Sequence, residues 1–162
     1  MFRVTPTAEP DCINAAKNYA LNLLSRRSYS CKEVALRLRR KGFVDHVNKD
    51  IIQLMKEYGY IDDVALAKRE LDQCLQKKRF GPKRIQLRLR QRGIAPEIIA
   101  EVMGSIDTVA VYELCFKEAQ RKLKRMPKLD TSTKHSRLSS FLFRRGFESD
   151  SINQCLRELL DM

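Results

Sequence analysis

The sequence predicts an all-α protein, built as a tandem array of three three-helix repeats that is elongated and curved. Three observations lead to this prediction. Leu, Arg, Lys, Glu and Ala, which favour helix, dominate the composition. Only 5 prolines and 6 glycines interrupt the 162 residues, and no segment reads as a strand. Finally, one short segment recurs three times at a period of about 50 residues.

The recurring segment has the spacing of a helix that ends in glycine. Its copies are Lys32–Phe43 (KEVALRLRRKGF), Lys83–Ile94 (KRIQLRLRQRGI) and Ser136–Phe147 (SRLSSFLFRRGF). Apolar residues stand eight and four positions before the glycine, on one helical face. A left-handed residue after a helix costs glycine little, and the preceding Lys or Arg suits the negative end of the helix dipole. The three predicted helix-ending glycines are Gly42, Gly93 and Gly146.

A longer helix is expected before each copy and a shorter helix after it. The longer helices are expected over about Asp11–Leu24, Asp62–Lys78 and Ile106–Lys124. The Thr- and Ser-rich stretch from Arg125 to His135 should lengthen the link inside the third repeat. A unit of about 50 residues buries little surface, so neighbouring repeats are expected to support one another. The predicted repeats span residues 11–58, 59–105 and 106–162.

Two turn motifs carry residues that could be mistaken for a functional site. In YGYIDD, Gly59 is predicted to stop one helix, and Asp62 and Asp63 to cap free N–H groups of a helical first turn. Acid–base chemistry or metal binding is the weaker interpretation, because no histidine or further acidic ligand is near. In RFGPKR, Gly81 marks a turn before a helix that starts at Pro82. Contact with a phosphate, through basic side chains at the start of that helix, is the weaker interpretation.

The basic residues are the most informative functional feature. A formal net charge of +12 favours a polyanionic partner such as nucleic acid, and the second copy contains no acidic residue at all. In the third copy, Phe141 and Phe143 replace two arginines and are expected to pack in the core or between repeats rather than stack on bases. The predicted partner- or DNA-binding residues are Arg37, Arg39, Arg40, Lys41, Lys83, Arg84, Arg88, Arg90, Arg92, Arg144 and Arg145.

The sequence offers no motif for catalysis. Five separated cysteines without a C-x-x-C pair favour reduced, buried thiols and no metal site. There is no phosphate-cradling or dinucleotide-binding glycine motif, so we expect no catalytic residues and no cofactor. We also expect a cytoplasmic protein without membrane contact, because no leader or stretch of roughly 18 apolar residues is found.

The order and spacing of YGYIDD, FGPKRIQLRLRQRGI and FLFRRGF resemble the RecX family of regulatory proteins, over about Ala15 to Leu160. The resemblance implies tandem three-helix repeats and a non-enzymatic protein. It also implies binding to RecA recombinase filaments, with inhibition of filament growth, ATP hydrolysis and strand exchange in DNA repair, homologous recombination and the SOS response. The positions matching the family motif are Gly59, Asp62, Asp63, Gly81 and Gly93.

The chain departs from the family pattern in two places. Val64-Ala65-Leu66 follow the Asp pair, where the family often has a polar residue, Arg and Phe, and the second-copy helix is unusually rich in arginine. We expect a monomer that contacts the filament and binds single- or double-stranded DNA more weakly, in a salt-dependent way. The alternative is a stand-alone DNA-binding helical module that places one Arg-rich helix in a major groove.

Overall fold

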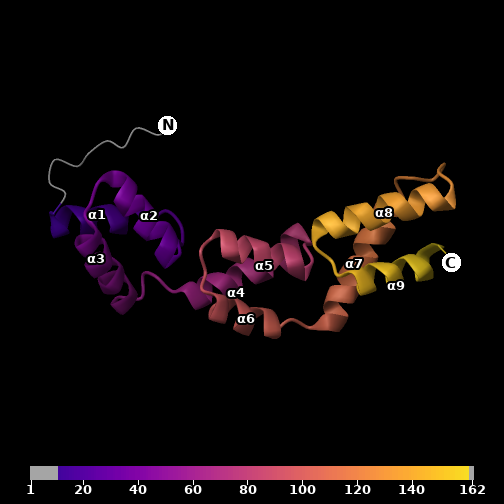
Figure 1. The fold of residues 1–162 in the computed structure, drawn as a ribbon. Helices are drawn as coiled ribbons and strands as arrows, with labels where there is room; N and C mark the ends of the chain where they lie inside the picture. The colour runs from indigo at the N-terminus through magenta and orange to yellow at the C-terminus, as the bar shows by residue number, and fades with distance from the viewer. Residues whose placement is uncertain (1–10, 161–162) are drawn as a thin grey trace. The chain divides into compact units, whose positions relative to one another are not determined.

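The computed structural model describes residues 11–160, and all regular structure in that range is helical (Figure 1). The prediction of an all-α fold made of three-helix repeats is confirmed. The helices are α1 (Ile13–Leu24), α2 (Cys31–Lys41), α3 (Asp45–Glu57), α4 (Asp63–Gln73), η1 (Cys74–Lys78), α5 (Pro82–Gln91), α6 (Pro96–Gly104), α7 (Thr108–Leu123), α8 (Thr131–Arg145) and α9 (Ser149–Leu160).

These helices form two compact units that do not coincide with the three repeats of the sequence. Within the described range, unit 1 contains residues up to Ala67 together with Arg90–Ile98, and unit 2 contains Lys68–Leu89 and the residues from Ile99 onward. The division passes through α4, α5 and α6, so the middle repeat contributes to both units.

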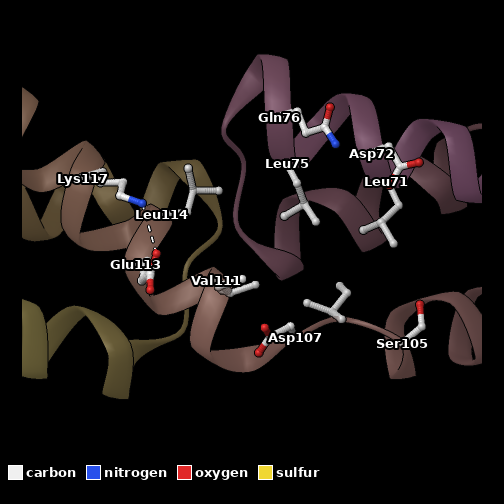
Figure 2. Close-up of a pocket in the computed structure, with 12 residues that line it drawn as sticks. Leu71, Asp72, Leu75, Gln76, Ser105, Asp107, Val111, Glu113, Leu114 and Lys117 are labelled. Atoms are coloured by element: carbon white, nitrogen blue, oxygen red, sulfur yellow. Dashed lines mark hydrogen bonds and ion pairs between the residues drawn. The ribbon is translucent and has the colours of Figure 1, made fainter.

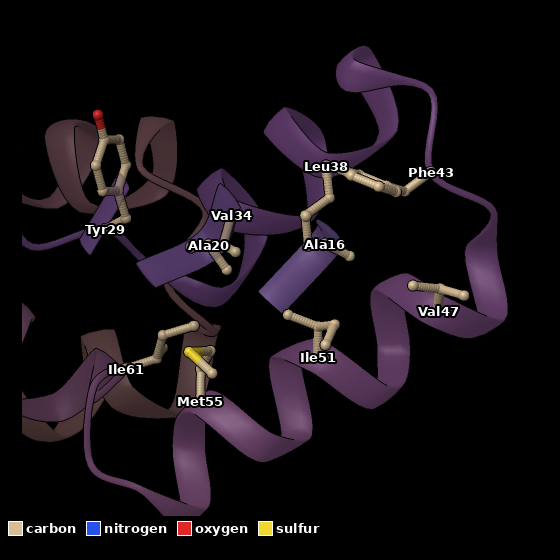
Figure 3. Close-up of a cluster of buried hydrophobic side chains, with 10 residues drawn as sticks. All are labelled: Ala16, Ala20, Tyr29, Val34, Leu38, Phe43, Val47, Ile51, Met55 and Ile61. Atoms are coloured by element: carbon tan, nitrogen blue, oxygen red, sulfur yellow. The ribbon is translucent and has the colours of Figure 1, made fainter. Parts of the chain in front are cut away.

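Unit 1 is organised around α1, α2 and α3, each of which packs against the other two. Figure 3 shows their apolar side chains converging on one core. Ala16 of α1, Leu38 of α2 and Ile51 of α3 are fully buried. Leu38 stands four residues before Gly42, which is the position that the repeated pattern predicted to be buried. Burying one such aliphatic side chain stabilises a fold by roughly 1.5–3 kcal/mol.

Unit 2 has an equivalent core where α7, α8 and α9 pack pairwise. Leu142 of α8 and Phe147 beyond it are fully buried there, beside Cys115 and Cys155. A hydrogen bond with Cys155, together with burial, raises the pKa of the Cys115 thiol. All five cysteines are free; Cys74, like these two, is buried, whereas Cys12 and Cys31 are only half-buried.

The predicted helix ends are confirmed by the backbone. Gly42, Gly93 and Gly146 follow α2, α5 and α8 with φ of 101°, 74° and 87°, a left-handed conformation that L side chains rarely adopt. Gly59 likewise follows α3 with φ of 71°. Asp62 caps α4, because its Oδ1 accepts a hydrogen bond from the Ala65 N–H at 2.8 Å.

Two predicted boundaries differ from the structure. The expected helix Asp62–Lys78 is interrupted, since α4 ends at Gln73 and the wider π-helical turn η1 follows. The link that was expected to reach His135 is shorter, because Asp130 accepts a hydrogen bond from the Thr133 N–H at 2.8 Å and starts α8 at Thr131. One capping carboxylate thus turns a Thr- and Ser-rich stretch into a first helical turn.

Candidate interaction surface

A first junction, in unit 1, fastens the end of α5 to the beginning of α2. The Ser30 hydroxyl donates to the Arg92 carbonyl at 2.5 Å and accepts from the Glu33 N–H at 3.1 Å. The Glu33 carboxylate in turn accepts from the Ser30 N–H at 2.9 Å and from Arg92 Nη2 at 2.8 Å. Arg92 Nη2 also donates to the Ser28 carbonyl at 2.9 Å. The guanidinium of Arg92 is therefore committed within the fold, with 17% of its side chain exposed.

The electrostatics of the first junction favour an ionised Glu33. Burial would raise the pKa of this carboxyl, but hydrogen bonds from Arg92 and from the Ser30 N–H outweigh burial and lower it. Asp63 adds a further cap, because its Oδ1 accepts from the Cys31 N–H at 3.0 Å. Both YGYIDD carboxylates thus accept helix N–H groups, as the capping interpretation predicted, but Asp63 does so on α2 and not on the helix that follows the motif.

A second junction, in unit 2, brings the end of α8 against the beginning of α5. The N–H groups of Gly81 and Lys83 donate to the carbonyls of Arg145 and Gly146 at 2.9 and 3.0 Å. A Cβ on Gly81 would lie 2.5 Å from the Gly146 carbonyl carbon, which is too close for any side chain. Only glycine permits this approach of two backbones, so the structural role predicted for Gly81 has a steric cause.

Two predicted contact residues of unit 2 serve buried carboxylates. Arg88 Nε donates to Glu70 Oε1 at 2.8 Å, and Lys78 Nζ lies 3.0 Å from the same oxygen. Burial would raise the pKa of Glu70, yet these two hydrogen bonds lower it to about 2. Arg145 Nη2 lies 3.4 Å from Glu118, whose side chain is only 3% exposed.

Four further predicted residues sit at the surface with local partners. In unit 1, Arg39 pairs with Asp45 at 3.1 Å, and Arg37 lies over the Tyr29 ring at 4.8 Å. In unit 2, Lys83 pairs with Glu148 at 2.7 Å. There Arg84 stacks over the Phe80 ring at 4.5 Å and donates to the Arg144 carbonyl at 2.6 Å.

The remaining predicted residues divide by exposure. Lys41, at the end of α2, is half-buried. Arg40, Arg90 and Arg144 are exposed, and no carboxylate of residues 11–160 lies within ion-pairing distance of their guanidinium groups. Among the predicted contact residues in residues 11–160, these three exposed arginines pair with neither a carboxylate nor an aromatic ring, so their charge is the most available to a partner.

The helix that carries Arg144 also corrects one prediction. Phe141 is half-buried and packs against the core of unit 2, as expected. The prediction that Phe143 packs is wrong, because its side chain is 62% exposed. The physical reason is its position three residues before Gly146, which corresponds to the exposed Arg39 and Arg90 in the other copies. The position on the helix, not the residue type, decides which side chains face outward.

Two exposed leucines escaped the sequence reasoning. Leu36 of α2 is 46% exposed and Leu87 of α5 is 53% exposed. Both stand six residues before the helix-ending glycine. Their exposure could have been predicted from this shared position. The core positions at eight and four residues before the glycine lie on the other side of the helix, so position six has to face outward.

Unit 2 also contains an open groove (Figure 2). One side is formed by the end of α4 and by η1, and the other by the beginning of α7. Leu71, Leu75, Val111 and Leu114 line it, with Asp72 and Glu113 among its polar residues. Lys117 pairs with Glu113 at 3.1 Å. None of the predicted basic residues reaches this groove.

Neither a metal site nor a membrane span is found in the part of the chain that the structure describes. Between residues 11 and 160, no group of three or more His, Cys, Asp or Glu residues is placed to hold a metal ion. Within the same residues, every helix is too short or too polar to cross a bilayer.

Comparison with known proteins assigns all three repeats. Models of the first, second and third three-helix domains of RecX match residues 16–53, 62–103 and 110–156. A protein of Pelodictyon phaeoclathratiforme named regulatory protein RecX is 32% identical over 145 residues, covering 90% of this chain and 89% of that protein. A Bacillus licheniformis protein of the same name is also 32% identical, over 86% of this chain but only 53% of its own length.

A solved structure agrees with these matches. The crystal structure of RecX from Lactobacillus salivarius superposes with a TM-score of 0.84 at 25% identity, covering 93% of this chain and 97% of that one. Both the sequence of each repeat and the fold therefore match the same family. The chain belongs to the RecX family of regulatory proteins.

Proposed function

We propose that this protein binds the filament of a RecA-type recombinase on DNA and inhibits filament growth, ATP hydrolysis and strand exchange. The observation that carries the proposal is the match of all three repeats to the RecX three-helix domains. The relatives bear the name regulatory protein RecX, and we propose that this protein regulates by binding, without catalysis. Its setting would be DNA repair, homologous recombination and the SOS response in the cytoplasm.

The available arginines support a polyanionic or acidic partner. Arg40, Arg90 and Arg144 project from the ends of α2, α5 and α8 without a carboxylate partner among the described residues. A nucleoprotein filament offers both phosphates and protein carboxylates to such side chains. Attraction of this kind weakens as salt is added. We propose that the protein acts as a monomer and contacts single- or double-stranded DNA more weakly than the filament.

The arginines that are paired within the fold are assigned a structural role. Arg92 holds the first junction, and Arg145 and Arg88 hold buried carboxylates in unit 2. To reach a partner, each of these guanidinium groups would first have to give up an ion pair with a buried or half-buried carboxylate, which is costly. We therefore assign direct contact first to Arg40, Arg90 and Arg144.

The stand-alone DNA-binding module is the weaker candidate. In a helix-turn-helix protein, the N-terminal residues of the recognition helix reach the base edges. Here the beginning of α2 is covered by Arg92, and the beginning of α5 by Arg145 and Gly146. The N-terminal ends of these two Arg-rich helices are engaged within the fold, so the geometry disfavours this mode of DNA reading.

The test is the single-stranded-DNA-dependent ATPase of a preassembled recombinase filament, titrated with this protein below stoichiometry. We expect inhibition at ratios too low to coat the DNA. In the triple variant Arg40→Glu, Arg90→Glu, Arg144→Glu, the inhibition should be weaker by at least about tenfold.

The matched control carries the same charge change at exposed arginines elsewhere, Arg26→Glu, Arg125→Glu and Arg157→Glu. It should retain most of the inhibition. No inhibition by the unaltered protein, with tight salt-dependent DNA binding, would reject the proposal in favour of the DNA-binding module. Equal losses in both triple variants would reject the residue assignment and indicate that net charge alone matters.

A further inference from the structure

The middle helix of each repeat carries one large apolar side chain that the fold leaves in solvent. These residues are Leu36 on α2, Leu87 on α5 and Phe143 on α8, which are 46%, 53% and 62% exposed. On α2 and α5 the opposite face is buried, through Leu38 and Leu89, whereas on α8 the buried Leu142 directly precedes Phe143. Single exposed apolar residues are ordinary on protein surfaces, but their recurrence on the corresponding helix of every repeat needs a cause.

Each of these apolar residues lies beside an arginine that has no carboxylate partner in residues 11–160. Arg40 stands four residues after Leu36, one helical turn away. Arg84 stands three residues before Leu87, and its guanidinium contacts only the Phe80 ring and the Arg144 carbonyl. Arg144 follows Phe143 directly.

In unit 2 two of these sites adjoin. The hydrogen bond from Arg84 Nη1 to the Arg144 carbonyl, at 2.6 Å, joins the beginning of α5 to the end of α8. The second junction holds the same two helix ends together through backbone hydrogen bonds. Leu87 and Phe143 therefore project from two helices whose ends are held rigidly against each other.

We propose that these apolar and basic sites dock onto acidic protein surfaces that have an apolar pocket, and that they make contacts separate from those to DNA. The inference rests on the proposed function, because the surface with this chemistry would be that of the recombinase subunits. The arginines require carboxylates, and the apolar side chains require a surface that removes them from water.

Protein fits these sites better than nucleic acid does. A phosphate backbone offers an arginine its charge but offers a leucine nothing to pack against. Bases stack on aromatic rings, and two of the three apolar residues are aliphatic. The presence of an exposed apolar residue and a nearby arginine on the corresponding helix of each repeat also matches a partner that presents the same surface repeatedly, as an assembly of identical subunits does.

The experiment compares the double variant Leu87→Ser, Phe143→Ser with the control Val109→Ser. Val109 is 66% exposed on α7 of the same unit, and no Lys or Arg lies within four residues of it. Three measurements are made on each protein. Binding to recombinase subunits without DNA is measured by interferometry, filament inhibition by the ATPase assay, and binding to labelled single-stranded DNA by anisotropy.

We expect the double variant to bind recombinase at least about tenfold more weakly and to inhibit correspondingly less. Its DNA affinity should stay within about twofold, and Val109→Ser should behave as the unaltered protein. Because all three residues are exposed, circular dichroism should be unchanged. Leu36→Ser provides the same test in unit 1.

The other outcomes separate the two proposals. If the unaltered protein inhibits the filament and the double variant inhibits equally, the docking sites are wrong and the proposed function stands. If DNA affinity falls in parallel with inhibition, the apolar side chains contact DNA and the protein-docking proposal is overturned. If the unaltered protein neither binds recombinase nor inhibits it, both proposals fail.

Discussion

The two junctions perform the same task with different atoms. In unit 1, the end of α5 is fastened to the beginning of α2 by the side chains of Ser30, Glu33 and Arg92. In unit 2, the end of α8 meets the beginning of α5 through backbone hydrogen bonds at Gly81 and Lys83. A junction made of side chains depends on charge, whereas a junction made of backbone depends on shape. The two should therefore respond to different substitutions.

The largest effect is expected from Gly81→Ala in the second junction. The added Cβ would meet the Gly146 backbone, which cannot rotate away as a side chain can. We expect a loss of about 3 kcal/mol in the free energy of unfolding, measured by urea titration. The matched control is Gly104→Ala, where no atom lies within 4 Å of the new Cβ. A control as destabilised as Gly81→Ala would show that steric contact is not the cause.

The next effect is expected from Arg92→Gln in the first junction. The substitution removes a charge-assisted pair and leaves Glu33, with 23% of its side chain exposed, without its main partner. We expect a loss of about 2 kcal/mol by urea titration. Arg39→Gln removes the ion pair with Asp45, in which both side chains are 69% exposed, and should cost less than about 0.5 kcal/mol. Similar losses in the two variants would mean that the first junction does not depend on its charge pair.

A smaller effect is expected at Gly93, where the strain of a positive φ can be distinguished from crowding by the Lys32 side chain. Gly93→Ala places a Cβ against the flexible Lys32 side chain and also has to accept a positive φ. Gly59→Ala accepts a similar φ with nothing within 4 Å of its Cβ, so it measures the strain alone. We expect about 1 kcal/mol for Gly59→Ala and up to about 2 for Gly93→Ala, in calorimetric melting. Lys32→Ala removes the Cγ and Cδ atoms that crowd the new Cβ but keeps the Lys32 Cβ, so it should narrow the difference between them. An undiminished difference would rule out crowding by the outer part of the Lys32 side chain.

The smallest effect concerns pH. The folded pKa of Glu33 lies below its usual value, so its contribution to stability is present above about pH 4.5 and is lost as the pH falls further. We expect Glu33→Gln to weaken the dependence of unfolding free energy on pH between about 5 and 3. The contribution of Glu70 is common to both proteins and cancels. An unchanged pH dependence in the variant would mean that Glu33 is not held in its charged form.

Local features of both junctions were open to prediction, but their partners were not. The glycine ends of α2, α5 and α8 and the cap at Asp62 follow from rules that act within a few residues, whereas Asp63 caps the beginning of α2, 32 residues earlier in the chain. Ser30-x-x-Glu33 is likewise a capping signature that can be seen in the sequence. Glu33 binds Arg92, however, across 59 residues, and no periodicity specifies such a pair.

The candidate surface shows the same limit. The abundance of arginine on α5 predicted an anionic partner, yet Arg88 and Arg92 both bind carboxylates of the fold. Sequence counts charges without showing which are paired. Arg90, between them, remains exposed because it lies on a different side of the helix. Exposure of Phe143 was missed for the opposite reason, since its apolar character was given more weight than its position.

The pairing of α2 with residues far downstream bears on how the chain folds as it is synthesised. During synthesis, the first repeat leaves the ribosome before Asp63 and Arg92 have emerged. Until then the Cys31 N–H and the Ser28 carbonyl lack the partners that they have in the finished protein. The N-terminal three helices therefore reach their final set of hydrogen bonds only when the middle repeat has been translated. A fragment meant to reproduce unit 1 has to extend to residue 98 rather than stop at 58.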